Sequence, residues 1–274
     1  MRLLVLMFGL LAAAASPAQQ QISEEVPYVR TPQQVVDAML DLAGVRASDF
    51  LIDLGSGDGR IVITAAKRYG ARGFGVDLDR RLVAESADRA RAAGVAERVA
   101  FYEQDIFKTD LDSASVITMY LLPEYNLVLR PRLLALKPGT RIVSHDWDMA
   151  DWKHDASVEV DAPDKPVGLK KSSTVHLWIV PARVEGRWRS RLAPGGRVAQ
   201  FDLRQNFQEI SGTVSVGGRS LPLERAVLKG TFLSFRVQEG KRSLRFNGHA
   251  AAGRISGQLG IGEQTYRWRA QRAD

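Results

Sequence analysis

Residues 53–60, Asp-Leu-Gly-Ser-Gly-Asp-Gly-Arg, combine residue types that hold a ligand through the backbone. Asp53 follows an apolar pair, and Gly55, Gly57 and Gly59 occupy alternate positions before a second apolar run. This order indicates a buried strand, a tight glycine turn and the first turn of a helix. Glycine is needed where φ is positive or where a ligand lies too close for a Cβ. The segment therefore predicts a ligand-binding turn, with a purely structural turn as the alternative.

Further polar residues follow later strands of the same region. Asp77 ends the next strand, 22 residues after Gly55, an offset that suits hydrogen bonds from ribose hydroxyls. A third strand, residues 99–102, leads to Asp105 and Ile106. The carboxyl ends of parallel strands meet at one edge of a sheet, which is where such sheets bind ligands. We therefore expect one site that includes Asp53, Asp77, Asp105, Tyr120 and His145.

Two cofactor fingerprints compete for the glycine turn. The NAD fingerprint G-x-G-x-x-G needs glycine or alanine where this chain has Arg60. The pattern D-x-G-x-G-x-G instead resembles that of class I (seven-stranded, Rossmann-like) S-adenosylmethionine methyltransferases. The resemblance implies that S-adenosylmethionine is the cofactor, that the turn around Ser56 packs against its sugar and amino-acid part, and that Asp105 lies near its adenine amino group.

Strand and helix segments alternate up to about residue 181. Thr31 and Pro32 predict the start of a first helix, with Thr31 as N-cap and Pro32 at the first helical position. A helix is predicted over Leu127–Leu136, and residues 157–160 and 174–180 would form a closing hairpin. Strands separated by helical crossovers predict an α/β fold, a doubly wound parallel sheet.

A different pattern begins at about Ala182. Short alternating runs separated by glycine turns, including Gly217-Gly218, predict a small all-β antiparallel barrel or sandwich of about seven strands. This part is strongly basic, because residues 182–274 carry 17 Lys+Arg and 7 Asp+Glu, whereas residues 1–181 carry 21 and 24. The basic excess predicts either a contact with an anionic envelope surface or a solvated arginine-rich face.

The N-terminus resembles an export signal. Arg2 precedes an apolar stretch that ends before Ser16-Pro17-Ala18 and a glutamine run. This predicts a signal peptide over residues 1–18 and a linker over 19–25, followed by a methyltransferase domain over 26–181 and the β-rich domain over 182–274. The expected location is periplasmic or envelope-associated in a bacterium, and an uncleaved membrane anchor or a cytoplasmic chain are the alternatives.

Composition excludes some classes of site. The chain has no cysteine, so disulfides and thiolate chemistry are excluded, and its four scattered histidines show no metal-ligand spacing. Basic residues are not grouped with stacking aromatics, so no nucleic-acid partner is expected. No further segment is apolar enough to span a membrane after removal of the signal peptide.

Four segments narrow the family resemblance: residues 27–32, 53–60, 120–124 and 139–145. Together they resemble the protein-lysine methyltransferases of the mitochondrial adenine nucleotide translocase and ATP synthase c subunit. The resemblance implies N-methylation of a protein lysine, with a small-molecule methyltransferase or a non-catalytic envelope-binding protein as alternatives. It implies cofactor contacts from Tyr28, Thr31, Asp53, Gly55, Ser56, Gly57, Asp77, Asp105, Ile106 and Tyr120. The candidate catalytic residues at the methyl-transfer channel are Tyr120, Glu124 and His145.

Overall fold

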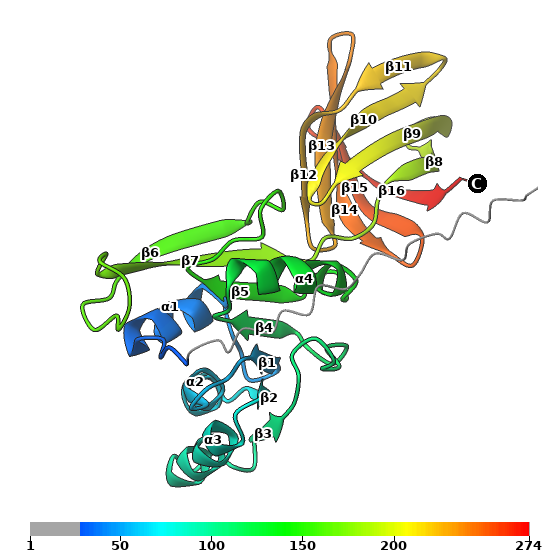
Figure 1. Ribbon diagram of the computed structural model, residues 1–274. Helices are drawn as coiled ribbons and strands as arrows, with labels where there is room; N and C mark the ends of the chain where they lie inside the picture. Colours follow the sequence, from blue (N-terminus) through cyan, green and yellow to red (C-terminus); the bar gives the residue numbers. More distant parts are fainter. Residues whose placement is uncertain (1–27, 274) are drawn as a thin grey trace, which may run out of the picture.

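The computed structural model describes residues 28–273 and contains two β-sheets that follow one another along the chain (Figure 1). The predicted signal peptide, residues 1–18, and the linker, residues 19–25, lie outside the described residues, as do residues 26 and 27. Within the described range, no helix is both long enough and apolar enough to cross a membrane. The chain passes from the first sheet to the second between Ile179 and Gly186.

The first sheet has the order β3-β2-β1-β4-β5-β7-β6. Its strands are β1 (Phe50–Leu54), β2 (Arg72–Asp77), β3 (Val99–Glu103), β4 (Val116–Met119), β5 (Arg141–His145), β6 (Ala156–Asp161) and β7 (Ser172–Ile179). β1 to β5 pair in parallel, and β7 is antiparallel to β5 and β6. This arrangement confirms the predicted α/β fold and its closing hairpin.

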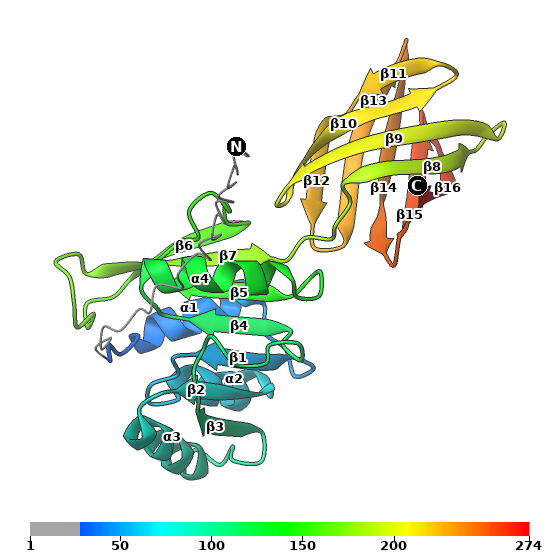
Figure 2. The ribbon, with the colours of Figure 1, turned by 45° about the vertical axis from the view of Figure 1, so that its right-hand side comes forward.

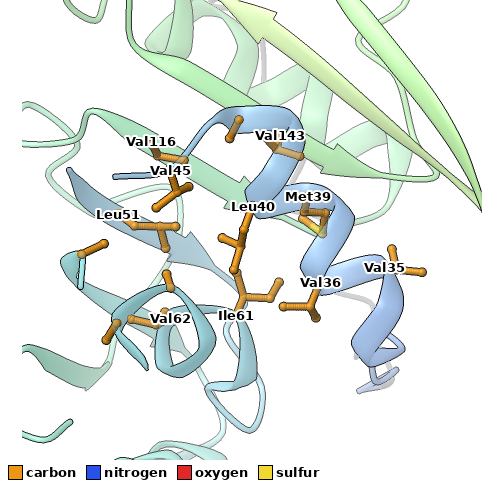
Figure 3. Close-up of a cluster of buried hydrophobic side chains, with 14 of the residues drawn as sticks. Val35, Val36, Met39, Leu40, Val45, Leu51, Ile61, Val62, Val116 and Val143 are labelled. Atoms are coloured by element: carbon orange, nitrogen blue, oxygen red, sulfur yellow. The ribbon is translucent and has the colours of Figure 1, made fainter. Parts of the chain in front are cut away.

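Helices cover both faces of this sheet. They are α1 (Gln33–Ala43), α2 (Arg60–Tyr69), α3 (Arg80–Ala92) and α4 (Pro123–Leu134). α1, α2 and α3 share one buried hydrophobic cluster, whereas α4 belongs to the cluster on the opposite face. Figure 3 shows Leu40 of α1 beside Ile61 of α2, with Leu51 of β1 next to them. Burial of each such side chain contributes about 1.5–3 kcal/mol to stability. This packing holds the helices against the sheet and so fixes the positions of the strand ends.

Two helix starts differ from the predictions. α1 begins one residue later, with Pro32 at the N-cap, and the prediction that Thr31 caps it is wrong because its side chain makes no capping hydrogen bond. The Thr31 hydroxyl lies 3.2 Å from Nδ1 of His145 instead. α4 begins at Pro123, four residues before the predicted start. Proline suits the first helical position because its φ is already helical and its missing N–H has no partner there.

The second sheet is antiparallel, with the order β11-β10-β9-β8-β16-β15-β14-β13-β12. Its strands are β8 (Gly186–Leu192), β9 (Arg197–Asn206), β10 (Glu209–Val216), β11 (Arg219–Pro222), β12 (Glu224–Lys229), β13 (Phe232–Glu239), β14 (Arg242–Ala251), β15 (Arg254–Ile261) and β16 (Gln264–Arg272). The edge strands β11 and β12 are consecutive, so the sheet curls into a nearly closed barrel (Figure 2).

The prediction of an antiparallel barrel or sandwich is confirmed as a barrel, but the predicted number of about seven strands is wrong, because the sheet has nine. β11 has only four residues, and Leu223 alone separates it from β12, so no glycine turn marks the change of strand. Aromatic side chains fill the interior. The Phe246 ring lies 5.6 Å from Phe201 and 5.1 Å from Trp268, in edge-on contacts. These rings form a core separate from those of the first sheet.

The turn between β9 and β10 packs on the loop that follows β5. The Phe207 ring stacks on Trp152 with centroids 6.0 Å apart and planes 18° apart. Gln208 accepts a hydrogen bond from the Trp152 indole at 3.1 Å and donates one to the Lys153 carbonyl at 2.6 Å. The Lys153 ammonium pairs with Glu209 at 2.8 Å. The barrel is therefore attached to the first sheet by this turn as well as by the connecting chain.

Candidate active site

The glycine turn after β1 has a backbone conformation that residues with a side chain rarely adopt. Gly55, Gly57 and Gly59 have φ values of 75°, 53° and 76°, in the left-handed region that favours glycine. A Cβ on Gly57 would lie 2.2 Å from the Tyr28 ring, and one on Gly55 would lie 3.0 Å from Leu121. The predicted cofactor residue Tyr28 thus lies directly against the turn.

Asp77 connects this turn to the end of β2. One carboxylate oxygen accepts the Gly57 N–H at 2.8 Å, and the other accepts the Asp79 N–H at 3.0 Å. A carboxylate offers about four lone-pair positions, so each oxygen still has one free acceptor position. Asp77 therefore fixes the turn and can also accept two ligand hydroxyls, which agrees with its predicted role at the ribose.

Asp53 is buried with one oxygen unsatisfied. Only 1% of the residue is exposed, and the Thr118 hydroxyl donates to its Oδ1 at 2.7 Å. Its Oδ2 has no hydrogen-bond partner among the described residues, and neither does the buried Oγ of Ser56. Burial raises the pKa of Asp53 to about 7. Two unpaired oxygens beside a glycine turn fit a ligand that carries donors and positive charge.

Asp105 and Ile106 follow β3 at the same carboxyl edge of the sheet. The Asp105 carboxylate accepts the Phe107 N–H at 2.8 Å, and its second oxygen lies 3.5 Å from the Lys108 ammonium. Its side chain is 31% exposed, so it is accessible to a ligand. Ile106 is buried next to it. The five strand ends that were expected to form one site do belong to neighbouring parallel strands.

Tyr120 and His145 form an uncharged aromatic stack after β4 and at the end of β5. Their ring centroids are 3.8 Å apart and the planes differ by 29°. Burial lowers the pKa of His145 to about 4 and raises the pKa of Tyr120 to about 12. The His145 nitrogens are within hydrogen-bond distance of two hydroxyls, Thr31 at 3.2 Å and Ser173 at 2.8 Å. His145 therefore supports Tyr120 as a neutral ring.

The carboxylate beside this stack is already paired. Asp146 has a φ of 63°, and one of its oxygens accepts the Thr174 N–H at 3.0 Å. Its other oxygen lies 2.7 Å from the Lys165 ammonium, of which only 11% of the side chain is exposed. Its charge is thus largely neutralised within the fold.

Glu124 stands apart from the other candidate catalytic residues. It is exposed on the first turn of α4, where a carboxylate complements the helix dipole. Among residues 28–273, no hydrogen bond or ion pair reaches it. The structure therefore brings Tyr120 and His145 together and leaves Glu124 in solvent.

Asp58 supports the turn but was not among the predicted site residues. It is 2% exposed and pairs with Arg60 at 2.6 Å and with Arg89 of α3 at 2.9 Å. Burial alone would raise the pKa of Asp58, but the hydrogen bond and charge of Arg60 outweigh it and lower that pKa. Arg60 also donates to the Thr31 carbonyl at 2.8 Å. The sequence feature from which this support could have been predicted is the run Asp58-Gly59-Arg60 at the end of the turn, which places an acid two residues before a base.

Comparison with known proteins places these features in a family. The model of the ANTKMT methyltransferase domain matches residues 53–156. A protein-lysine N-methyltransferase of Saccharolobus islandicus is 37% identical over 157 residues, which are 57% of this chain and 94% of that protein. The adenine nucleotide translocase lysine N-methyltransferase of Mus musculus is 34% identical over 156 residues, which are 56% of this chain but only 62% of that protein.

A solved structure agrees with this relationship. It is described as an RNA methyltransferase from Salinibacter ruber in complex with S-adenosyl-L-homocysteine. It is 47% identical, with a TM-score of 0.52 over 57% of this chain and 96% of its own. The glycine turn, the acids at the carboxyl ends of β1, β2 and β3 and these matches all agree. The chain belongs to the ANTKMT-type family of S-adenosylmethionine-dependent methyltransferases.

Proposed function

We propose that this methyltransferase transfers a methyl group to the ε-amino group of a protein lysine. The main support is the archaeal protein-lysine N-methyltransferase, because the similarity covers 94% of that protein. The mouse relative, which acts on a lysine of the adenine nucleotide translocase by its name, points to the same acceptor class. The observation in the structure that carries the proposal is the neutral stack of Tyr120 on His145.

S-adenosylmethionine supplies a methyl group on a positively charged sulfonium, which needs only a correctly placed neutral nucleophile. Asp53, Ser56, Asp77 and Asp105 would hold this cofactor around the glycine turn. A lysine attacks only as the neutral amine, and an aromatic, uncharged surface favours that form by desolvation. The pairing of Asp146 with Lys165 keeps a free carboxylate from stabilising the ammonium form. Tyr120 and His145 therefore act by positioning and by excluding water, and no residue is needed as a strong base.

The acceptor class is tested by incubating protein that lacks residues 1–18 with labelled S-adenosylmethionine and extracts. We expect label in protein, on lysine after hydrolysis. Tyr120→Ala should lower the rate by about 10²-fold, because positioning is lost. Tyr102→Ala is the matched control, since that tyrosine is 49% exposed on β3. Label in RNA would favour the activity for which the Salinibacter structure is described, and label in small metabolites the small-molecule alternative; either result overturns the lysine proposal.

Asp53 predicts a pH dependence of cofactor binding. Its pKa of about 7 without ligand means that most of the carboxyl is protonated at pH 6. A cationic ligand favours the carboxylate, so affinity should rise by up to about tenfold per pH unit below 7 and binding should release a proton. Calorimetry in two buffers of different ionisation enthalpy measures this release. Asp53→Asn should bind more weakly and show no proton release; an unchanged release would rule out Asp53 as its source.

The location of the protein is a separate proposal. The apolar stretch of residues 1–18 supports export, and the basic composition of residues 182–274 supports contact with an anionic envelope surface. Fractionation of the source cells tests it with an antibody against the chain. Recovery of the full-length chain from the cytoplasm, with its N-terminus intact, would overturn export.

A further inference from the structure

The barrel contains an interrupted ladder between β8 and β16. These strands pair at only three positions, Ala270 with Ser190, Gln271 with Arg189, and Arg272 with Trp188. Both strands continue beyond this point, since β8 extends to Leu192 and β16 begins at Gln264. The next pair in the same register would set Arg269 opposite Arg191. Like charges directly opposite each other destabilise an antiparallel pair.

A cavity of about 560 Å³ lies at this interruption. It is lined by Arg189, Ser190, Arg191, Arg269, Gln271, Arg272 and Ala273, with no acidic residue among the described residues around it. Burial alternates along both strands, so Arg189, Arg191, Arg269 and Gln271 are all exposed on the outer surface of the barrel. We call the cavity lined by Arg189, Arg191, Arg269, Gln271 and Arg272 the arginine cavity.

The guanidinium groups of the arginine cavity differ in how they are held. Arg272 is fixed, because it donates to the carbonyls of Glu185 at 2.7 Å and Arg183 at 3.1 Å and lies over the Trp188 ring at 4.8 Å. The guanidinium groups of Arg189, Arg191 and Arg269 make no hydrogen bond or ion pair with the described residues.

Ser190 lies between Arg189 and Arg191 on β8 and faces the barrel interior, where it is paired with the buried Ala270. Its hydroxyl, which has no hydrogen-bond partner in the described part of the chain, therefore belongs to the interior and not to the arginine cavity. What distinguishes the cavity is that its arginines have no acidic partner among residues 28–273. Elsewhere on the barrel, Arg197 forms an ion pair with Glu239 at 2.7 Å.

We propose that the arginine cavity binds a phosphate-bearing anion. Guanidinium groups match phosphate geometry through paired N–H donors, and several of them around one cavity favour an anion with more than one negative charge. The bound anion would neutralise the repulsion that interrupts the ladder. A soluble diphosphate and a phospholipid headgroup present the same chemistry. This site lies outside the methyltransferase sheet and does not depend on the proposed methyl acceptor, and a headgroup ligand would account for the proposed envelope contact of residues 182–274.

The test uses the double variant Arg191→Gln, Arg269→Gln in the full chain without residues 1–18. The control is Arg204→Gln, Arg236→Gln, which removes the same charge from exposed barrel positions on β9 and β13. Binding of inorganic pyrophosphate is measured by calorimetry at physiological salt. Binding to phosphatidylglycerol vesicles is measured by co-sedimentation against phosphatidylcholine vesicles.

The cavity variant should bind about tenfold more weakly or worse, because two charge-assisted contacts are lost, whereas the control should change by less than about threefold. Without anion, the cavity variant should melt up to about 4 °C higher, since a like-charge pair is removed. Tighter binding of pyrophosphate identifies a soluble anion, and tighter binding of vesicles identifies a headgroup. Equal losses in both variants, or no binding of either probe to the unaltered protein, would overturn the proposal.

Discussion

Asp77→Ala is expected to lower the affinity for S-adenosylmethionine by about 30- to 150-fold, which corresponds to about 2–3 kcal/mol. Two effects combine in this loss. The free acceptor positions of the carboxylate disappear, and the Gly57 N–H loses the partner that holds the turn at 2.8 Å. Calorimetry with S-adenosylmethionine and its demethylated product measures the change in affinity.

Asp79→Ala is the matched control for this prediction. Asp79 lies two residues away and caps α3, accepting the backbone N–H groups of Arg81 and Leu82. Its loss should cost about 1 kcal/mol of stability but little affinity. Asp77→Asn keeps one acceptor oxygen and should fall between the two. If Asp79→Ala weakened binding as much as Asp77→Ala, the assignment of Asp77 to the cofactor would be wrong.

Trp152→Ala is expected to have the largest effect on stability, a loss of about 3–5 kcal/mol. Trp152 is fully buried between the methyltransferase sheet and the barrel, where it contacts Phe207 and lies 6.2 Å from the Trp178 ring. Its removal leaves a cavity and takes away the indole N–H that donates to the side-chain oxygen of Gln208. Chemical denaturation followed by tryptophan fluorescence and by far-UV circular dichroism measures the loss.

Trp147→Ala serves as the control because Trp147 is in the same loop but 42% exposed. It should cost about 1 kcal/mol or less. Trp152→Phe keeps a ring for stacking and loses the indole N–H, so an intermediate cost is expected. Similar losses for Trp152→Ala and Trp147→Ala would show that the contact with the barrel adds nothing to stability.

The parts of the site that follow a strand end could be predicted from the sequence. Glycines at alternate positions require a left-handed backbone, and an acid directly after each apolar run can only lie at the carboxyl edge of a parallel sheet. Asp53, Gly57 and Asp77 are therefore placed by local pattern alone. The same reasoning favoured the methyltransferase fold over an NAD fold, because Arg60 occupies the position where NAD proteins need a small residue.

Contacts between distant segments could not be predicted in this way. Thr31 and His145 are 114 residues apart, and nothing in the local pattern distinguishes a helix cap from a hydroxyl facing a buried ring. The turn around Phe207 also could not be predicted, because a two-residue hairpin loop favours glycine or asparagine at the position where this chain has Phe207 with a φ of 52°. Such features depend on the tertiary arrangement.

The double attachment of the barrel has a consequence for gene fusion. A single-domain relative that acquired this C-terminal module by joining the reading frames alone would lack the second attachment. The recipient would also need an aromatic residue and a cation at the positions of Trp152 and Lys153, to receive the turn that carries Phe207, Gln208 and Glu209. A chimera built only at the connecting chain should leave the module tethered but undocked, whereas a graft that includes the loop should restore the docked arrangement.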